Sequence, residues 1–528
     1  MNPLTRTSTL LAALALAVTA TATPQYQIYD IGVVQVGDSA SQGFGASPGG
    51  VAVGRSFRSG GTQAFTWTLS GGLVGLPNLS GRSYAVSNSA NDSGTVVGTG
   101  ATTAFGSGRL PVKWQNGVVS QLPLPSGETL GDANSVNASS VAVGSINAGS
   151  TQRGVIYNGA NATVITQVTP GGSYFLTAFG INNAGRIVGQ GIDPGNAARN
   201  VGIVYDMGQT AAFEVGALPG ANGALAFGVS NTGYVVGASM MNQGSGFPFI
   251  WSDANGIVAI PLATGTSQGT ARAVNSAGWV VGNDSSAFSI PFLYDGTTTY
   301  RLADIIPANS GWDLSMNTSA SALGLSDSNI IVGTGVYNGN THAYAMVPLL
   351  QLTAAVSRKT HGAAGTFDIP LALIGSPSVE CRNTGGNHTL VFTFSNAIVS
   401  GSAAVTGGNG NVSGSPTFSG NTMTVSLSSV TDIQTLTLTL SSVTDSFAQV
   451  LPSTALSLQF LVGDVNGSHG VSSTDVAITK SVVGSATVMT FHSDIDANGA
   501  INSTDVSQVK ANAGHSLPAA LWSPPVKK

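Results

Sequence analysis

The sequence predicts a mostly β protein in three parts: a seven-bladed β-propeller over residues 24–348, an immunoglobulin-like β-sandwich over 350–461 and a small α-helical module over 462–516. Three observations predict these parts. A short motif recurs seven times, about every 46 residues. Segments that alternate between apolar and polar residues follow, and two loops rich in Asp and Asn lie near the C-terminus.

The composition limits the classes of protein. Charged residues make up 8% of the 528 residues, against roughly 25% in an average globular protein, so uncharged polar residues must cover the surface. With 70 Gly, 22 Pro and 42% hydrophobic residues, the chain should fold with many turns. A net charge of −5 favours neither nucleic acid nor an anionic membrane as a partner. We expect a monomer.

Residues 1–22 have the features of a secretory signal peptide: Arg6, an apolar run over Leu10–Val18, and small residues at Ala20–Ala22. The run is too short to span a bilayer, and no later segment is long and apolar enough. We therefore expect a secreted or cell-surface-attached protein without a membrane span. Cys381 is the only cysteine, and we expect a buried side chain there rather than a reactive thiol.

The repeated motif is a β-branched pair, or a near match to one, followed by glycine. An apolar run that ends in a large side chain, such as Trp67 or Trp114, follows each glycine after 12–16 residues. Fixed periods of this length are typical of solenoids and propellers. The seven glycines are Gly54, Gly98, Gly144, Gly189, Gly237, Gly282 and Gly333.

Each repeat contains four short apolar segments separated by turn residues. In the fifth repeat, Asn231-Thr232-Gly233 and Asp253–Gly256 accept positive φ and so close hairpins. Asn116-Gly117, Asn158-Gly159 and Asp295-Gly296 stand at corresponding places in other repeats. Four antiparallel strands at this period are typical of a propeller blade.

The last repeat lacks a recognisable fourth strand, and the missing strand is found at the other end of the array. Tyr26–Ile31 resembles Tyr300–Ile305, the fourth-strand segment of the sixth repeat. If the N-terminal segment completes the last repeat, every sheet edge is paired and the ring closes. An eight-bladed or open arrangement is the alternative.

Ala178–Gly189, Ala64–Trp67 and His342–Tyr344 resemble the HAF-family extracellular repeat, and the resemblance covers about residues 25–348. That family occurs in exported bacterial proteins. The resemblance implies a propeller-like fold and no particular activity.

Residues 350–461 lack the repeat. Thr389–Phe394, Thr422–Leu427 and Leu436–Leu440 alternate between polar and apolar residues, which favours half-buried antiparallel strands. A segment of this length suggests an immunoglobulin-like sandwich that serves as a spacer. A carbohydrate-binding role is the alternative, although we see no cluster of exposed aromatic residues that supports it.

The loop 494–505 has the spacing of a calcium-binding EF-hand loop. Oxygen-bearing side chains stand at positions 1, 3, 5, 9 and 12, a carbonyl is available at position 7, and Gly499 occupies the sharp turn at position 6. The predicted calcium ligands are Asp494, Asp496, Asn498, Ala500, Asn502 and Asp505. A short helix should follow.

A second loop, 464–475, repeats this register with two faults. Ser468 is a weak ligand, and His469 stands where glycine is preferred. We expect this loop to bind Ca²⁺ more weakly or not at all. Its predicted ligands are Asp464, Asn466, Ser468, Gly470 and Asp475.

The two loops, each followed by a helix, resemble a type I dockerin over residues 462–516. In that family a Ser-Thr pair before the last Asp contacts a cohesin. The matching positions are Ser473 and Thr474 in the first loop and Ser503 and Thr504 in the second. The resemblance implies a cohesin-like partner, with a cell-surface or polysaccharide partner as the alternative.

The sequence holds few candidates for catalysis. There are three Glu (Glu128, Glu214 and Glu380) and one His in the repeats, His342. Asp206, Asp253 and Asp295 follow strands, where we expect them to cap turns. We predict a non-enzymatic exported protein for binding or display. The alternative is a polysaccharide-active enzyme, a glycoside hydrolase or lyase, which should place two or more non-repeated acids in the central funnel.

Overall fold

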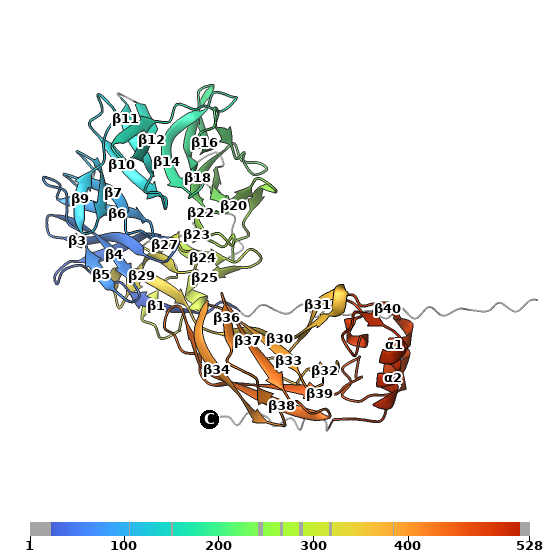
Figure 1. Cartoon of the computed structure of the whole chain (residues 1–528). Coiled ribbons are helices and arrows are strands. Elements are labelled where there is room, and N and C mark those ends of the chain that lie inside the picture. The colour runs from blue at the N-terminus through green and yellow to red at the C-terminus, as the bar shows by residue number, and fades with distance from the viewer. Residues whose placement is uncertain are drawn as a thin grey trace, which may run out of the picture. The chain divides into compact units, whose positions relative to one another are not determined.

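The computed structural model describes residues 23–517, except 105, 149–150, 241–245, 264–267, 285–288, 316–318 and 384. The predicted signal peptide, and residues 518–528 of the tail 517–528 that we expect after the small α-helical module, lie outside the described residues. The described chain is mostly β with two α-helices, and it divides into an N-terminal unit, 25–349, and a C-terminal unit that begins at residue 350 (Figure 1). No described helix is long and apolar enough to cross a membrane.

Antiparallel four-stranded groups make up most of the N-terminal unit. The first two groups join into one sheet through a single parallel bridge between Thr62 and Tyr84. The strands of the first six groups are β2 (Ala40–Ala46), β3 (Ala52–Arg58), β4 (Gly61–Thr68) and β5 (Gly72–Gly75); β6 (Tyr84–Ala90), β7 (Val96–Ala101), β8 (Leu110–Gln115) and β9 (Val118–Gln121); β10 (Gly131–Val136), β11 (Ala142–Ala148), β12 (Thr151–Asn158) and β13 (Asn161–Val164); β14 (Tyr174–Ile181), β15 (Arg186–Asp193), β16 (Asn196–Asp206) and β17 (Phe213–Glu214); β18 (Gly223–Val229), β19 (Val235–Met240), β20 (Gly246–Ser252) and β21 (Gly256–Ala259); β22 (Gly269–Val274), β23 (Val280–Asp284), β24 (Ile290–Tyr294) and β25 (Thr299–Arg301).

The last group takes its outer strand from the N-terminus, as expected. It contains β26 (Trp312–Asp313), β27 (Ser321–Leu325), β28 (Ile331–Tyr337) and β29 (Asn340–Pro348), and β1 (Tyr26–Asp30) pairs with β29. The register runs from Tyr26 opposite Pro348 to Asp30 opposite Tyr344. Tyr26 and Ile28 are buried in the same core cluster as Tyr344 and Met346.

The repeated glycine has a steric cause. In all seven groups the first strand carries a bulge, and the motif glycine of the second strand lies beside it. A Cβ atom on any of these glycines would lie 1.8–2.1 Å from a backbone carbonyl oxygen of the first strand. The bulge leaves no room for a side chain, so glycine is required once in every repeat.

Hydrogen bonds join successive repeats at the turn after the first strand. Asn91, Asn137 and Asn182 each donate from Nδ2 to a carbonyl oxygen of the next repeat, and Thr232 donates from Oγ1 to Ser276 O. The last repeat is joined to the first, since Asp327 N donates to Pro48 O at 2.9 Å. Gly49 N donates to Asp92 Oδ1 between the first two repeats, and Asn275 Nδ2 donates to Ser326 O between the last two. The repeats therefore contact one another in a closed order.

Two sheets with a common core form the region 350–461 of the C-terminal unit, called here the sheet region. One sheet contains β30 (Leu352–His361), β31 (Gly365–Pro370), β33 (His388–Phe394), β35 (Asn411–Val412), β36 (Thr417–Ser419) and β37 (Thr422–Ser428); the other contains β32 (Val379–Glu380), β34 (Ile398–Gly407), β38 (Gln434–Asp445) and β39 (Thr454–Phe460). Phe392 and Met423 of the first sheet pack with Leu438 and Leu458 of the second.

Residues 462–517, called here the helical module, contain α1 (Ser473–Ser481) and α2 (Ser503–Ala511), with the short strands β40 (Gly484–Ser485) and β41 (Ala500–Ile501) pairing between them. Both helices begin with a capping box. Val379 and Leu461 share a core cluster with Ile495 and Val509, so the helical module and the sheet region are packed together.

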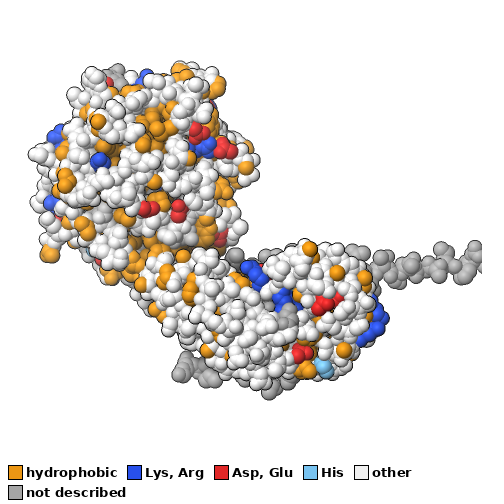
Figure 2. Space-filling model, viewed as in Figure 1, with side chains coloured by type: hydrophobic (Ala, Val, Ile, Leu, Met, Phe, Trp, Pro, Cys, Tyr) orange, Lys and Arg blue, Asp and Glu red, His pale blue; other side chains and the backbone are white. Residues whose placement is uncertain are grey.

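The low charge content is visible on the surface. On the face drawn in Figure 2, charged side chains are few and scattered among uncharged atoms. This agrees with the surface that the composition predicts.

Candidate calcium site

The loop 494–505 is shaped by hydrogen bonds to its first and last residues. Asp494 accepts from Asn498 N at 3.1 Å and from Gly499 N at 2.8 Å. Asp505 accepts from Ile495 N and from Asn502 N, both at 2.8 Å, and the second bond belongs to the capping box of α2. Gly499 has a φ of 95°, which is the sharp turn expected at position 6.

Three carboxylates converge in this loop. Oxygen atoms of Asp494, Asp496 and Asp505 all lie within 4.8 Å of one another, and Asp494 and Asp505 are fully buried. Partial burial raises the pKa of Asp496, and the negative charge of Asp505 raises it further. Three negatively charged oxygen donors so close together fit Ca²⁺, because a bound cation would relieve the repulsion between the carboxylates.

The other predicted ligands of this loop have partners of their own. The Asn498 side chain donates to Asp496 Oδ2 and accepts from Ala500 N, both at 2.9 Å. Asn502 Oδ1 accepts from Thr504 N at 2.7 Å, so this oxygen caps α2. Ala500 O accepts from Asn502 Nδ2.

The first loop, 464–475, has the same backbone pattern with fewer charges. Asp464 accepts from Ser468 and His469 of its own loop, and Asp475 accepts from Asn466 N and Ser472 N. His469 has a φ of 67°, in the left-handed region where glycine is preferred. Ser468 Oγ donates to Gly470 O. With two carboxylates in place of three, this loop offers a weaker site for a cation.

A histidine of the sheet region contacts the second loop. His361 Nδ1 lies 2.8 Å from Asp494 Oδ2, and both side chains are fully buried. Burial lowers the pKa of His361, while its hydrogen bond to Asp494 opposes that shift. No sequence pattern indicates this contact, because the two residues are 133 positions apart and His361 ends an ordinary alternating strand.

The predicted partner-binding residues are accessible. Ser473 and Thr474 lie in the first turn of α1, Ser503 and Thr504 lie in the first turn of α2, and all four are exposed. Each pair stands directly before the buried last Asp of its loop. The structure therefore presents two similar polar surfaces, one beside each loop.

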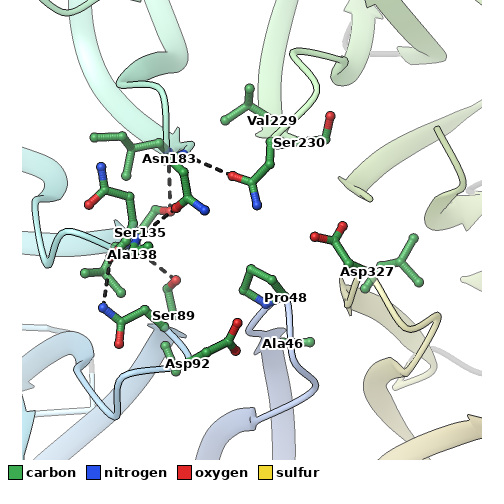
Figure 3. A pocket seen from close by; sticks show the side chains of 17 residues that line it. Ala46, Pro48, Ser89, Asp92, Ser135, Ala138, Asn183, Val229, Ser230 and Asp327 are labelled. Atoms are coloured by element: carbon green, nitrogen blue, oxygen red, sulfur yellow. Dashed lines mark hydrogen bonds between the residues drawn. The ribbon is translucent and has the colours of Figure 1, made fainter. Parts of the chain in front are cut away.

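The N-terminal unit contains a pocket that described residues line. Its volume is about 140 Å³, and it opens where the turns after the first strands converge (Figure 3). Asp92 and Asp327 line it on either side of Pro48, at the same position of two repeats (Figure 3). Asp92 Oδ1 accepts from Gly49 N, and Asp327 Oδ1 accepts from Ser276 N, both at 2.8 Å.

The acids expected to cap turns behave in two ways. Asp295 accepts from the backbone N–H groups of Thr297 and Thr298, as expected. Asp206 and Asp253 instead form ion pairs with Arg186 at 2.7 and 2.8 Å, a partner that the turn pattern did not indicate.

Residues 462–512 match the dockerin type I domain. Type I dockerin domains bind Ca²⁺ and serve as calcium-dependent modules for attachment to cohesins, typically in extracellular or cell-surface proteins. No curated protein matches the chain significantly.

Several solved structures resemble parts of the chain weakly. TolB from Acinetobacter baumannii is 14% identical, with a TM-score of 0.32 over 43% of this chain and 54% of TolB. A gluconolactonase from Xanthomonas campestris is 9% identical, with a TM-score of 0.30 over 62% of this chain and 96% of the gluconolactonase. An oligogalacturonate lyase from Vibrio parahaemolyticus is 9% identical, with a TM-score of 0.37 over 62% of this chain and 95% of the lyase. The chain thus spans about half the length of TolB. At these TM-scores the likeness carries no argument about this chain.

Proposed function

We propose that this chain is an exported, non-enzymatic protein for binding or display, which its helical module attaches to a cohesin-bearing partner in a calcium-dependent manner. The observation that carries the proposal is the loop 494–505, where three carboxylates converge within a segment that matches the dockerin type I domain. Asp494, Asp496 and Asp505 would hold the ion, together with Asn498 and Ala500 O. The first loop would hold a second ion more weakly, through Asp464, Asn466, Ser468, Gly470 and Asp475.

In this proposal Ser473, Thr474, Ser503 and Thr504 contact the partner. Their exposure and their place in the first helical turns support that role. Calcium would act indirectly, because it fixes the loop that leads into each helix. A partner would then recognise a surface that exists only in the loaded module.

We infer further that the N-terminal unit is a seven-bladed propeller of HAF-type repeats closed by β1, and that the sheet region is an immunoglobulin-like sandwich. The closed order of hydrogen bonds between repeats, the seven bulge–glycine pairs and the pairing of β1 with β29 support the ring. The common core between two mostly antiparallel sheets supports the sandwich.

One observation favours the alternative of a polysaccharide-active enzyme: two acids, Asp92 and Asp327, line the pocket. Both stand at one repeated position, however, and each accepts a backbone N–H group from the preceding repeat. This supports a role in joining repeats rather than the paired, differently placed carboxylates of a glycosidase.

The attachment is tested with the full chain on immobilised type I cohesin. We expect the unsubstituted chain to bind the cohesin in Ca²⁺ and to be released in EDTA. Asp494→Asn should fail to bind in either condition. Asp304→Asn removes one exposed charge from the N-terminal unit and is the matched control, which should bind normally. Binding that ignores EDTA would contradict the proposal.

A panel of polysaccharides separates the two functions. A binding protein should retain a glycan without changing it. Release of new reducing ends or unsaturated products, abolished by Asp92→Asn with Asp327→Asn, would instead establish the enzyme.

A further inference from the structure

One buried chain of polar groups connects the sheet region with the loop 494–505. It runs from Glu380 through Arg382 and His361 to Asp494, and all four side chains are at most 1% exposed. Such groups are costly to bury unless each is fully paired. Their arrangement therefore specifies how the loop sits on the sheet region.

The direction of the hydrogen bonds in this chain follows from the chemistry of arginine. Arg382 Nη1 lies 3.2 Å from His361 Nε2, and a guanidinium can only donate, so Nε2 accepts. The ring proton is then on Nδ1, which donates to Asp494 Oδ2 at 2.8 Å. Arg382 thus selects the histidine tautomer that can donate to Asp494.

Glu380 holds Arg382 in place. Its two oxygens accept from Nε and Nη2 of Arg382, each at 2.8 Å. The remaining N–H groups of Arg382 donate to Phe367 O and Ser357 O. Burial raises the pKa of Glu380, but the hydrogen bonds and charge of Arg382 outweigh it and hold that pKa at about 2.

The loop also touches the sheet region through its main chain. A Cβ atom on Gly362 would lie 2.1 Å from Asn498 O, and one on Gly499 would lie 2.6 Å from His361 O. Asn383 N donates to Ile495 O at 2.7 Å. The loop is thus held against the end of β30, at His361 and Gly362, and against Asn383, three residues after β32.

We propose that His361 is a positioning residue for the calcium ligand Asp494, and that the loop 494–505 reaches its full calcium affinity only when it is packed on the sheet region. The inference rests on the proposed function, in which this loop holds Ca²⁺. A partner that fixes a ligating carboxylate typically contributes 10–100-fold to metal affinity. Asp464 of the first loop accepts instead from residues of its own loop, so no side chain of the sheet region positions this carboxylate. The first loop contacts the sheet region through its turn residue, since His469 Nδ1 is hydrogen-bonded to Gln459 Oε1 of β39.

The test is calorimetric titration of the full chain with CaCl₂. In an Asp475→Asn background, which weakens the first loop, we expect His361→Phe to raise the Kd of the second loop about 10–100-fold. His361→Asn, whose Nδ2 can donate from near the place of the ring Nδ1, should recover part of the loss. His342→Phe removes a matched histidine–carboxylate hydrogen bond in the N-terminal unit and should leave the Kd unchanged.

The first loop supplies the readout that separates positioning from damage to the fold. In an Asp505→Asn background, which weakens the second loop, His361→Phe should leave the Kd of the first loop unchanged. Equal loss in both loops, or loss in neither, overturns the positioning role. If His361→Phe does not fold, His361→Gln, which cannot place a donor at Nδ1, should show the same selective loss.

Absence of calcium binding in the unsubstituted chain has a different meaning. It overturns the proposed calcium site itself, and this inference with it. Binding that is normal in the unsubstituted chain and insensitive to His361 overturns only the inference.

Discussion

His342 Nδ1 and Asp30 Oδ1 lie 2.9 Å apart and join β29, the last strand of the N-terminal unit, to β1, its first strand. The two residues are 312 positions apart, so this contact forms only when the chain has passed through all seven repeats. The ladder between β1 and β29 accompanies it, from Tyr26 to Asp30. A short N-terminal segment therefore stabilises contacts between the two ends of a long array.

Tyr26 tests how much this segment contributes. Its ring is 1% exposed, and its hydroxyl has no hydrogen-bond partner among the described residues. Tyr26→Ala should lower the free energy of unfolding of the N-terminal unit by about 3–5 kcal/mol, as for other buried aromatic side chains. Tyr26→Phe removes only the unpaired hydroxyl, so its stability should be equal or higher. Thermal unfolding followed by tryptophan fluorescence measures both, and similar losses for the two variants would contradict this account.

The repeats could be predicted from the sequence because their cause is local. Each motif glycine lies beside a bulge in the preceding strand, and Asn116 and Gly117 adopt the positive φ that their turn position indicated. The pairing of β1 could be predicted because Tyr26–Ile31 has a counterpart in the array. In contrast, nothing local indicated that Arg186 would hold both Asp206 and Asp253, since they come from neighbouring repeats.

Two glycines of β7 provide a matched test of the bulge. A Cβ atom on Gly98 would lie 1.9 Å from Val86 O, whereas one on Gly100 would meet nothing closer than 3.5 Å. Gly98→Ala should destabilise the N-terminal unit by about 3 kcal/mol or more, because the backbone must move. Gly100→Ala should change stability by less than about 1 kcal/mol. Chemical denaturation of the two variants checks this, and equal effects would disprove the steric explanation.

The candidate calcium site could be predicted only in part. The spacing of Asp494, Asp496 and Asp505 along one loop was sufficient to bring them together, because a tight loop of this length fixes its own geometry. The spacing could not show that Asn502 caps α2 with its oxygen. It also could not reveal His361, because contact between distant segments depends on how the helical module packs on the sheet region.

His388 should make the sheet region less stable in mild acid. It is 7% exposed and contacts the ring of Phe460. Burial, together with the positive charges of Lys359 and Arg382, lowers its pKa to about 4, and the negative charge of Glu380 opposes this shift only in part. Between pH 6.5 and 4 the unfolded chain binds a proton that the folded chain does not, so stability falls as the pH falls through this window. The full effect is about 3 kcal/mol.

Hydrogen exchange of the β33 amides between pH 4 and 7, corrected for intrinsic rates, measures this loss. In His388→Phe the free energy of opening of β33 should depend less steeply on pH, by the slope that corresponds to the uptake of about one proton. His342→Gln removes an imidazole from the N-terminal unit and serves as the control. A pH dependence that is the same in His388→Phe and the unsubstituted chain would refute the assignment.

Calcium removal should affect the whole C-terminal unit. If residues 462–516 folded independently, a chelator would destabilise them alone, but Val379 and Leu461 share a core cluster with Ile495 and Val509. We therefore expect EDTA to lower the melting transition of the sheet region and the helical module together. At a Ca²⁺ concentration 100 to 1,000 times the Kd, the ion contributes about 3–4 kcal/mol. Calorimetry in Ca²⁺ and EDTA, with the transition of the N-terminal unit as internal reference, distinguishes the two outcomes.

Asp496→Asn should have opposite effects on the melting temperature of the C-terminal unit in EDTA and in Ca²⁺. In EDTA the substitution removes a charge that Asp505 and Asp494 repel, so the C-terminal unit should melt at an equal or higher temperature. In Ca²⁺ it removes a ligand, so the unit should melt lower than the unsubstituted chain. Asp304→Asn should shift neither transition of the C-terminal unit. Destabilisation by Asp496→Asn of the same size in both conditions would mean that the carboxylate serves the fold rather than the ion.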